Sequence, residues 1–412
     1  MPADNTTAPR LDVDAILADP GVRIVVCCGA GGVGKTTTAA ALALRAAERH
    51  GRRTVVLTID PARRLAQALG LSELDNTPRQ VKLDNDTAPA GGPAATRQPD
   101  PDRQPDPAGR AGPGEAGEGG GELHAMMLDM KRTFDEVVLA HTDPRRAEEI
   151  FANPFYQAMS STFAGTQEYM AMEKLGQLRA RDEWDLIVVD TPPSRSALDF
   201  LDAPARLGRF LDGRMLRLLL APARAGGRSV FSVVTASFGL FSRAVQKVLG
   251  GQLIGDLSGF VAALDSMFGG FRDRAELTYR VLQAPETAFL VVAAPEPDAI
   301  REAGYFAGRL AADRMPLHGL VLNRVHRVAA AALPAETSLA AAAELAGAAE
   351  HRPAVDVLRI HAGLAQQVAR ETRTAARFSV DHPGVPVVPV AAQPADVHDL
   401  DGLREIGTAL AG

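Results

Sequence analysis

The residues best suited to chemistry lie together in one eight-residue stretch. Gly29 to Thr36 read G-A-G-G-V-G-K-T, which fits the phosphate-loop pattern G-x-x-x-x-G-K-[ST]. Glycines let a loop wrap closely around an anion, so that successive backbone N–H groups point at phosphate oxygens. The lysine of such a loop reaches the β- and γ-phosphates, and the hydroxyl after it binds Mg²⁺. We therefore predict a nucleotide site built from Gly29, Gly31, Gly32, Val33, Gly34, Lys35, Thr36 and Thr37.

The segments on either side have the character that this loop requires. Residues 22–28 read V-R-I-V-V-C-C, a short apolar run typical of a strand that is buried on both faces. Residues 36–51 are rich in Ala and Leu and end at Gly51, which is typical of a helix closed by glycine. The start of that helix adds the positive end of its dipole to the phosphate site.

Two aspartates and an asparagine extend the predicted site. Asp190 ends the run D-L-I-V-V-D, where an aspartate of a phosphate-loop enzyme orients a water bound to Mg²⁺. Asp60, in T-I-D-P-A-R-R-L, either caps the next helix or accepts a hydrogen bond from an attacking water. Asn323, in L-V-L-N-R-V, can pair with an adenine edge, with a turn asparagine as the alternative. The residues after it are not the Lys and Asp of a GTPase, so we predict ATP rather than GTP.

These motifs resemble those of the ArsA-like family, the arsenite-pump and tail-anchored-protein-targeting ATPases, and the resemblance covers nearly the whole chain except one insertion. The family loop G-K-G-G-V-G-K-T corresponds to GAGGVGKT, and the family's first switch S-x-D-P-A-H-N-L corresponds to TIDPARRL. Its second switch, D-T-A-P-T-G-H-T-L-R-F-L, corresponds to DTPPSRSALDFL and matches at Asp190, Leu198, Phe200 and Leu201. The resemblance implies Mg²⁺-dependent ATP hydrolysis in a nucleotide-gated dimer. It also implies that Asp60 positions the attacking water and that Asn323 lies on the adenine side.

The departures from the family pattern bear on activity. Ala30 stands where the family carries a lysine that crosses the dimer interface, and Arg195 and Ser196 replace the second-switch Gly and His. Three arrangements follow: a heterodimer with a lysine-bearing paralogue, a homodimer in which an arginine substitutes, or a nucleotide-binding scaffold. The family's paired cysteines for interface zinc are absent. The only cysteines are Cys27 and Cys28, so thiolate-based arsenite binding is not expected.

Strands that alternate with helices predict the fold class, an α/β phosphate-loop NTPase with a mostly parallel, doubly wound sheet and an inserted helical subdomain. Besides 22–28, we expect strands near 52–61, 122–129, 183–193, 288–297, 316–325 and 384–390. The predicted ATPase core comprises 21–84, 122–135, 170–200 and 283–412, after an N-terminal extension at 1–20. Residues 85–121 form a disordered Pro/Gly-rich insertion, and 136–169 with 201–282 form the helical subdomain.

The helical zone at 201–282 leaves three interpretations open. Residues 208–228 mix leucines with arginines, and several Phe and Met residues follow up to Phe271. An ordinary helical core is favoured. An apolar groove for a hydrophobic client helix, which the family's targeting branch implies, and contact with a membrane surface are the alternatives.

Composition limits the class of protein. The formal net charge of −6 argues against a general nucleic-acid binder. No apolar signal region precedes residue 15, and no uncharged apolar run reaches the ~18 residues of a membrane span. The two adjacent cysteines are expected to pack in the core of a reduced protein. We therefore predict a cytoplasmic protein, with peripheral attachment at a membrane as a second option.

Overall fold

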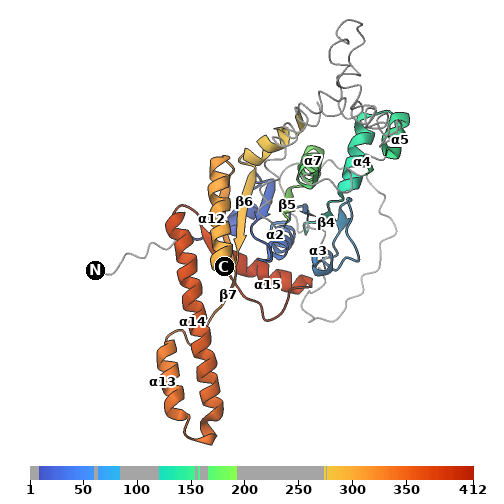
Figure 1. Ribbon diagram of the computed structural model, residues 1–412. Helices are drawn as coiled ribbons and strands as arrows, with labels where there is room; N and C mark the ends of the chain where they lie inside the picture. The colour runs from blue at the N-terminus through green and yellow to red at the C-terminus, as the bar shows by residue number, and fades with distance from the viewer. Residues whose placement is uncertain are drawn as a thin grey trace, which may run out of the picture.

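The computed structural model describes residues 9–59, 64–83, 120–153, 156–157, 166–192, 273–274 and 276–412 (Figure 1). Its strands are β1 Ile24–Cys28, β2 Thr54–Thr58, β3 Arg79–Gln80, β4 Leu123–Met127, β5 Leu186–Asp190, β6 Thr287–Ala293, β7 Leu317–Val325 and β8 Val387–Ala391. Its helices are α1 Val13–Ala18, α2 Lys35–His50, α3 Arg64–Ala68, α4 Met130–His141, α5 Pro144–Ala152, α7 Thr166–Arg181, α12 Pro297–Ala312, α13 Ala335–Leu345, α14 Arg352–Asp381 and α15 Leu400–Ala411.

The strands form one eight-stranded sheet in the order β3-β4-β2-β5-β1-β6-β7-β8. Every pairing is parallel except that of β3 with β4. The predicted fold class is therefore confirmed, and each strand expected from the sequence is present. The two-residue edge strand β3 was not predicted, because so short a segment carries no periodic signal.

The centre of the sheet is apolar because helices cover it. All residues of β1, β2, β5 and β6 are buried, which matches the near-continuous hydrophobic runs of parallel strands. Helix α2 packs against this centre and against α15. It ends at Gly51, which has a φ of 62° and donates its N–H to Ala46, as the sequence pattern indicated.

The N-terminal residues belong to this packed unit. Helix α1 buries Val13, Ile16 and Leu17, and it contacts both α2 and α15. The side chain of Arg52, 7% exposed, donates to the carbonyl groups of Leu17, Asp19, Val22 and Asp185. The described part of the predicted N-terminal extension is thus tied to the amino edge of the sheet. The remaining domain boundaries stay predictions, because most of 193–275 lies outside the described residues.

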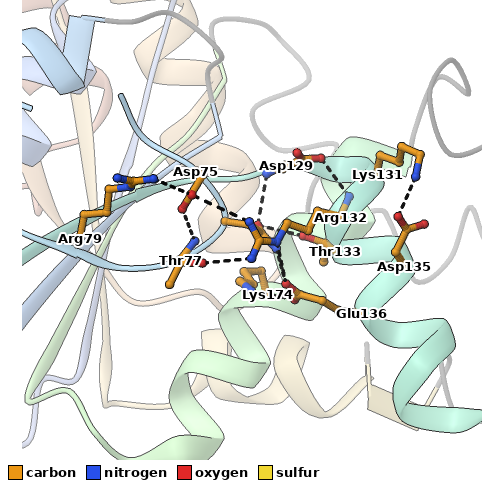
Figure 2. A network of polar contacts seen from close by, with 11 residues as sticks. Asp75, Thr77, Arg79, Asp129, Lys131, Arg132, Thr133, Asp135, Glu136 and Lys174 are labelled. Atoms are coloured by element: carbon orange, nitrogen blue, oxygen red, sulfur yellow. Dashed lines mark hydrogen bonds and ion pairs between the residues drawn. The ribbon is translucent and has the colours of Figure 1, made fainter. Parts of the chain in front are cut away.

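A polar network lies beside β3 and β4, at the side of the sheet away from β8, and it includes Asp129, Thr133, Glu136 and Lys174 (Figure 2). Buried Asn76 contacts three of these residues: its Oδ1 accepts from the Asp129 N–H at 3.2 Å and from the Thr133 hydroxyl at 3.1 Å, and its Nδ2 donates to Glu136 at 3.1 Å. Lys174 of α7 reaches the same Glu136 carboxylate at 3.0 Å. These contacts join the turn before β3 to α4 and α7. They satisfy buried polar groups and have a structural role.

Helices α13 and α14 form an antiparallel hairpin that projects from the rest of the molecule (Figure 1). The two helices pack along each other, and the 30-residue α14 also contacts α12 and β7. One part of α14 therefore lies against the sheet. Exposed Val357 and Ile360 lie toward its other end.

Candidate nucleotide-binding site

The phosphate loop joins β1 to α2 at the carboxyl edge of the sheet. Gly34 precedes the helix in a left-handed conformation, with a φ of 96°. At Gly29, with a φ of 151°, an added Cβ would lie 2.0 Å from the Val292 carbonyl oxygen. Both positions therefore require glycine, and the loop passes close to the end of β6.

Lys35, at the start of α2, is only 5% exposed and points back over the loop. Its Nζ donates to the Ala30 carbonyl oxygen at 2.8 Å. The Lys35 ammonium therefore lies within the loop whose backbone N–H groups are suited to bind phosphate. The strand–loop–helix arrangement predicted from the motif is present in the structure.

Thr36 and Asp190 come together from different elements. The Thr36 hydroxyl donates to Asp190 Oδ2 at 2.7 Å, and Thr58 at the end of β2 donates to the same oxygen at 2.9 Å. Asp190 is fully buried, and parallel pairing places it opposite Cys27 of β1 and Thr58 of β2. A hydroxyl beside a carboxylate forms the hard oxygen donor set that Mg²⁺ prefers, so these residues fit the predicted ion.

Asn323 lies on the opposite side of the loop from Asp190. Its Nδ2 donates to the Val33 carbonyl oxygen at 2.8 Å, and the side chain is largely buried. A Cβ on Gly34 would lie 2.2 Å from that same nitrogen. The amide therefore braces the phosphate loop with one of its hydrogens, a contact that the sequence did not indicate.

A pocket of about 1220 Å³ opens over these residues. One wall is the phosphate loop with Lys35, Thr36 and Thr37, and another is Leu65 and Gln67 of α3. The far wall is made by Asn323, Arg324, His326, the end of β8 at Ala391 and the segment that follows it, residues 392–398. The lining thus runs from the phosphate loop toward β7 and β8, and the volume of the pocket is large enough for a nucleotide.

The two cysteines next to the loop are packing residues, as predicted. Both are buried and free. Burial and the nearby Asp190 carboxylate raise the pKa of Cys27 well above its ordinary value, and burial raises the pKa of Cys28 to about 12. Both thiols are therefore protonated at neutral pH, and neither has the character of a reactive nucleophile.

Several predicted residues lie outside the described part of the chain. Asp60 is among them, as are the second-switch residues Arg195, Ser196, Leu198, Phe200 and Leu201 and the candidate client zone at 208–271. Thr58 and Arg324 are site residues that sequence reasoning missed. A polar residue at the end of a buried strand was the available signal for Thr58.

No helix among the described residues has both the length and the apolar character needed to cross a bilayer. The same residues contain no cluster of His, Cys, Asp and Glu side chains able to hold a metal ion without further ligands. A metal held at Thr36 and Asp190 would therefore depend on oxygens from a bound nucleotide or water.

The sheet is mostly parallel and carries a phosphate loop after its central strand, beside a buried lysine and a paired hydroxyl and carboxylate. These features define a phosphate-loop nucleotide-binding protein. The anion-transporting ATPase family model matches residues 22–89 and 122–332, and the chain belongs to that family. The gap in this match falls within the predicted 85–121 insertion.

Individual relatives are distant. The chain is 29% identical over 192 residues to protein Rv2184c of Mycobacterium tuberculosis, covering 46% of this chain and 39% of that protein. It is 30% identical over 215 residues to an uncharacterised Streptomyces coelicolor protein, covering 52% and 44%. It is 22% identical over 282 residues to the ATPase GET3 of Malassezia globosa, covering 67% of each. The chain thus matches less than half the length of the first two relatives.

Proposed function

We propose that the chain is a Mg²⁺-dependent ATPase that works as a nucleotide-gated dimer and handles a client or partner protein. The observation that carries the hydrolytic part is the 2.7 Å hydrogen bond between Thr36 and Asp190 beside the phosphate loop. Hydrolysis is also supported by membership of an ATPase family and by the relative from Malassezia globosa, which is named as an ATPase.

The chain's own residues divide the work. The backbone N–H groups of Gly29 to Thr37 bind the phosphates, and Lys35 exchanges the Ala30 carbonyl for phosphate oxygens. Thr36 would hold Mg²⁺ directly, and Asp190 would hold it through a water. The ion, when bound, neutralises charge that develops on the β- and γ-phosphates. Asp60 is proposed to accept a hydrogen bond from the attacking water, which orients it for in-line attack.

Dimerisation and client handling rest on the family resemblance alone. The candidate client groove is the zone from 208 to 271, in which leucine, phenylalanine and methionine recur. Flexible apolar side chains of this kind adapt to varied hydrophobic partners. We place the cycle in the cytoplasm, with peripheral contact at a membrane as the alternative.

One observation favours a second candidate, a catalytically weak nucleotide-binding subunit that pairs with a lysine-bearing paralogue. Ala30 packs against the core and contributes only its backbone carbonyl to Lys35. Its methyl group cannot stabilise phosphate charge across an interface. The loss of such a cation lowers phosphoryl-transfer rates by about 10³-fold or more, by analogy with an arginine finger.

Steady-state ATP turnover measured against protein concentration tests both candidates. An active homodimer should show turnover per chain that rises with concentration and disappears in Lys35→Ala. Lys82→Ala is the matched control, because Lys82 is an exposed lysine outside the pocket. Tight Mg²⁺–ATP binding without turnover at any concentration would support the weak subunit. Absence of ATP binding would overturn both candidates.

A further inference from the structure

The last residues of β7 include a strained one, at the point where the pairing register with β8 shifts between Leu322 and Val325. Arg324 has a φ of 61°, in the left-handed region that non-glycine residues avoid. A long side chain in this conformation costs free energy and persists only where the surrounding structure holds the backbone. Such positions cluster at ligand sites, and Arg324 lines the nucleotide pocket between Asn323 and His326.

Glu371 of α14 holds the chain where β7 ends. Its carboxylate is 5% exposed and accepts the backbone N–H of His326 at 2.9 Å through Oε2. Its Oε1 contacts His326 Nδ1 at 2.7 Å and accepts from Gln367 Nε2 at 2.8 Å. Both oxygens of one buried carboxylate are therefore committed to fixing the chain two residues after Arg324.

The Arg324 side chain is exposed at the pocket mouth. Among the residues that the structure describes, it forms no hydrogen bond and no ion pair. Arg324 thus lines a polar pocket in a strained backbone conformation and has no protein partner among the described residues. Its guanidinium plane is therefore available to a ligand.

Sheet order determines which part of the nucleotide it faces. The phosphate loop follows β1, and the Thr36–Asp190 pair joins the start of α2 to the end of β5, a strand next to β1. β7 lies on the other side of β1, two strands away, or about 10 Å at ordinary strand spacing. Beyond it, the segment after β8 closes the pocket. A nucleotide with its phosphates at β1 therefore extends its base toward β7 and β8, away from the Mg²⁺ side.

From these positions we infer that Arg324 stacks its guanidinium on the nucleobase, and that Glu371 is a positioning residue that holds Arg324 there through His326. This inference rests on the proposed nucleotide-binding function. Glu371 lies beyond residue 332, outside the stretch that the family model matches.

Binding of ATP, ADP and AMP to the full chain tests the assignment. Because a base contact is shared by all three nucleotides, Arg324→Ala should raise their dissociation constants by one common factor, about tenfold for a stacked cation. A loss that grows with the number of phosphates would overturn the inference and would assign Arg324 to the phosphates. Unchanged affinity would overturn it as well.

The chain contains a matched control for backbone strain. Arg314 is also exposed and left-handed, with a φ of 55°, but it precedes β7 at the opposite edge of the sheet. Arg314→Ala should leave all three affinities unchanged. An equal loss in both variants would mean that the effect comes from the strained backbone, and the stacking assignment would fail.

A double-substitution cycle tests Glu371. Glu371→Gln keeps the shape but has one acceptor oxygen where two are used, so all three nucleotides should bind about threefold more weakly. Combined with Arg324→Ala, it should add no further loss, because its effect passes through Arg324. Additive losses would indicate a general structural role and would overturn the positioning assignment. If the wild-type chain bound no adenine nucleotide, the proposed function would fail first.

Discussion

At the scale of single residues, Gly34 is a position in the phosphate loop that has no room for a side chain. Its φ of 96° disfavours any side chain, and an added Cβ would meet the Asn323 amide nitrogen at 2.2 Å. Gly34→Ala should displace Asn323 from the Val33 carbonyl and weaken ATP binding by about tenfold or more. Isothermal titration with Mg²⁺–ATP measures this directly.

Gly70→Ala separates strain from crowding in that experiment. Gly70 has a comparable φ of 67°, but a Cβ there would have no neighbour within 4 Å. This control should lose about 1 kcal/mol of stability through backbone strain and keep its ATP affinity. Equal ATP affinities in the two variants would contradict the role given to the Gly34–Asn323 contact.

Ala30 offers a gain-of-function prediction. If a cation at this position limits turnover, Ala30→Lys should raise the turnover of the homodimer by up to about 10³-fold, by analogy with a supplied arginine finger. Ala30→Met is the control of similar length without charge. Both variants keep the backbone carbonyl that Lys35 uses. Equal rates in the Lys variant and the wild type would show that another group already supplies the charge.

The candidate site residues that the sequence could indicate are those with local signals, and their roles stay predictions. Gly34, Lys35 and Thr36 lie in one contiguous motif, and Asp190 ends an unmistakable buried strand. The role of Glu371 could not be predicted, because it contacts His326, 45 positions earlier in the chain, only in the folded molecule. The local sequence R-E-T does not show whether Glu371 is buried and hydrogen-bonded or exposed to solvent.

At the scale of elements, one carboxylate ties α1 to α2. Asp14 accepts from Arg45 at 2.6 and 2.7 Å and contacts His50 at 2.9 Å. These partners, Arg45 first, lower the pKa of Asp14 to about 2. Because this folded-state pKa is below the ordinary value near 4, the stabilisation is present above pH 4 and is lost as the pH falls toward 2.

Asp14→Asn should therefore lower the free energy of unfolding at pH 7 by about 1 kcal/mol, a value reduced for the partial exposure of the side chain. The difference from wild type should shrink between pH 4 and pH 2, as urea unfolding at several pH values would show. Asp298→Asn is the control, since that side chain is 85% exposed in its pair with Arg301. A difference independent of pH would contradict the assignment.

Helices and strands can be predicted where the hydrophobic pattern of the sequence is strong, and cannot be predicted where tertiary contacts determine the structure. The buried strands β1, β2, β5 and β6 were evident as apolar runs. Helix α1 has only six residues, and its packing against α2 and α15 is a property of the folded molecule. The sequence alone therefore indicates only an N-terminal extension for this region.

At the scale of the whole molecule, the sheet joins residues that are far apart in the chain. Ile24 of β1 pairs with Ile187 of β5 and with Thr287 of β6. Both neighbours of the central strand are therefore separated from it by more than 150 residues. Folds dominated by such non-local pairing form slowly, because loop closure precedes the contacts that stabilise it.

A nascent chain tests this order of assembly. A ribosome-bound chain stopped at residue 280 lacks β6, β7 and β8, and so lacks Asn323 and one whole side of the pocket. It should show no protection of the β1 region from protease by ATP. A full-length chain extended by a linker and held on the ribosome should be protected. Equal protection of the two would contradict the requirement for β6.

The separation of β1 from β6 also bears on synthesis. The phosphate loop is made early, but its supporting strand lacks its second neighbour until about two thirds of the chain has been translated. At elongation rates of about 5–20 residues per second, roughly a quarter of a minute or more separates the synthesis of β1 from the synthesis of β6. During that interval an apolar strand with an unpaired edge is exposed to the cell, and a chaperone that shields extended hydrophobic segments is the protection it needs.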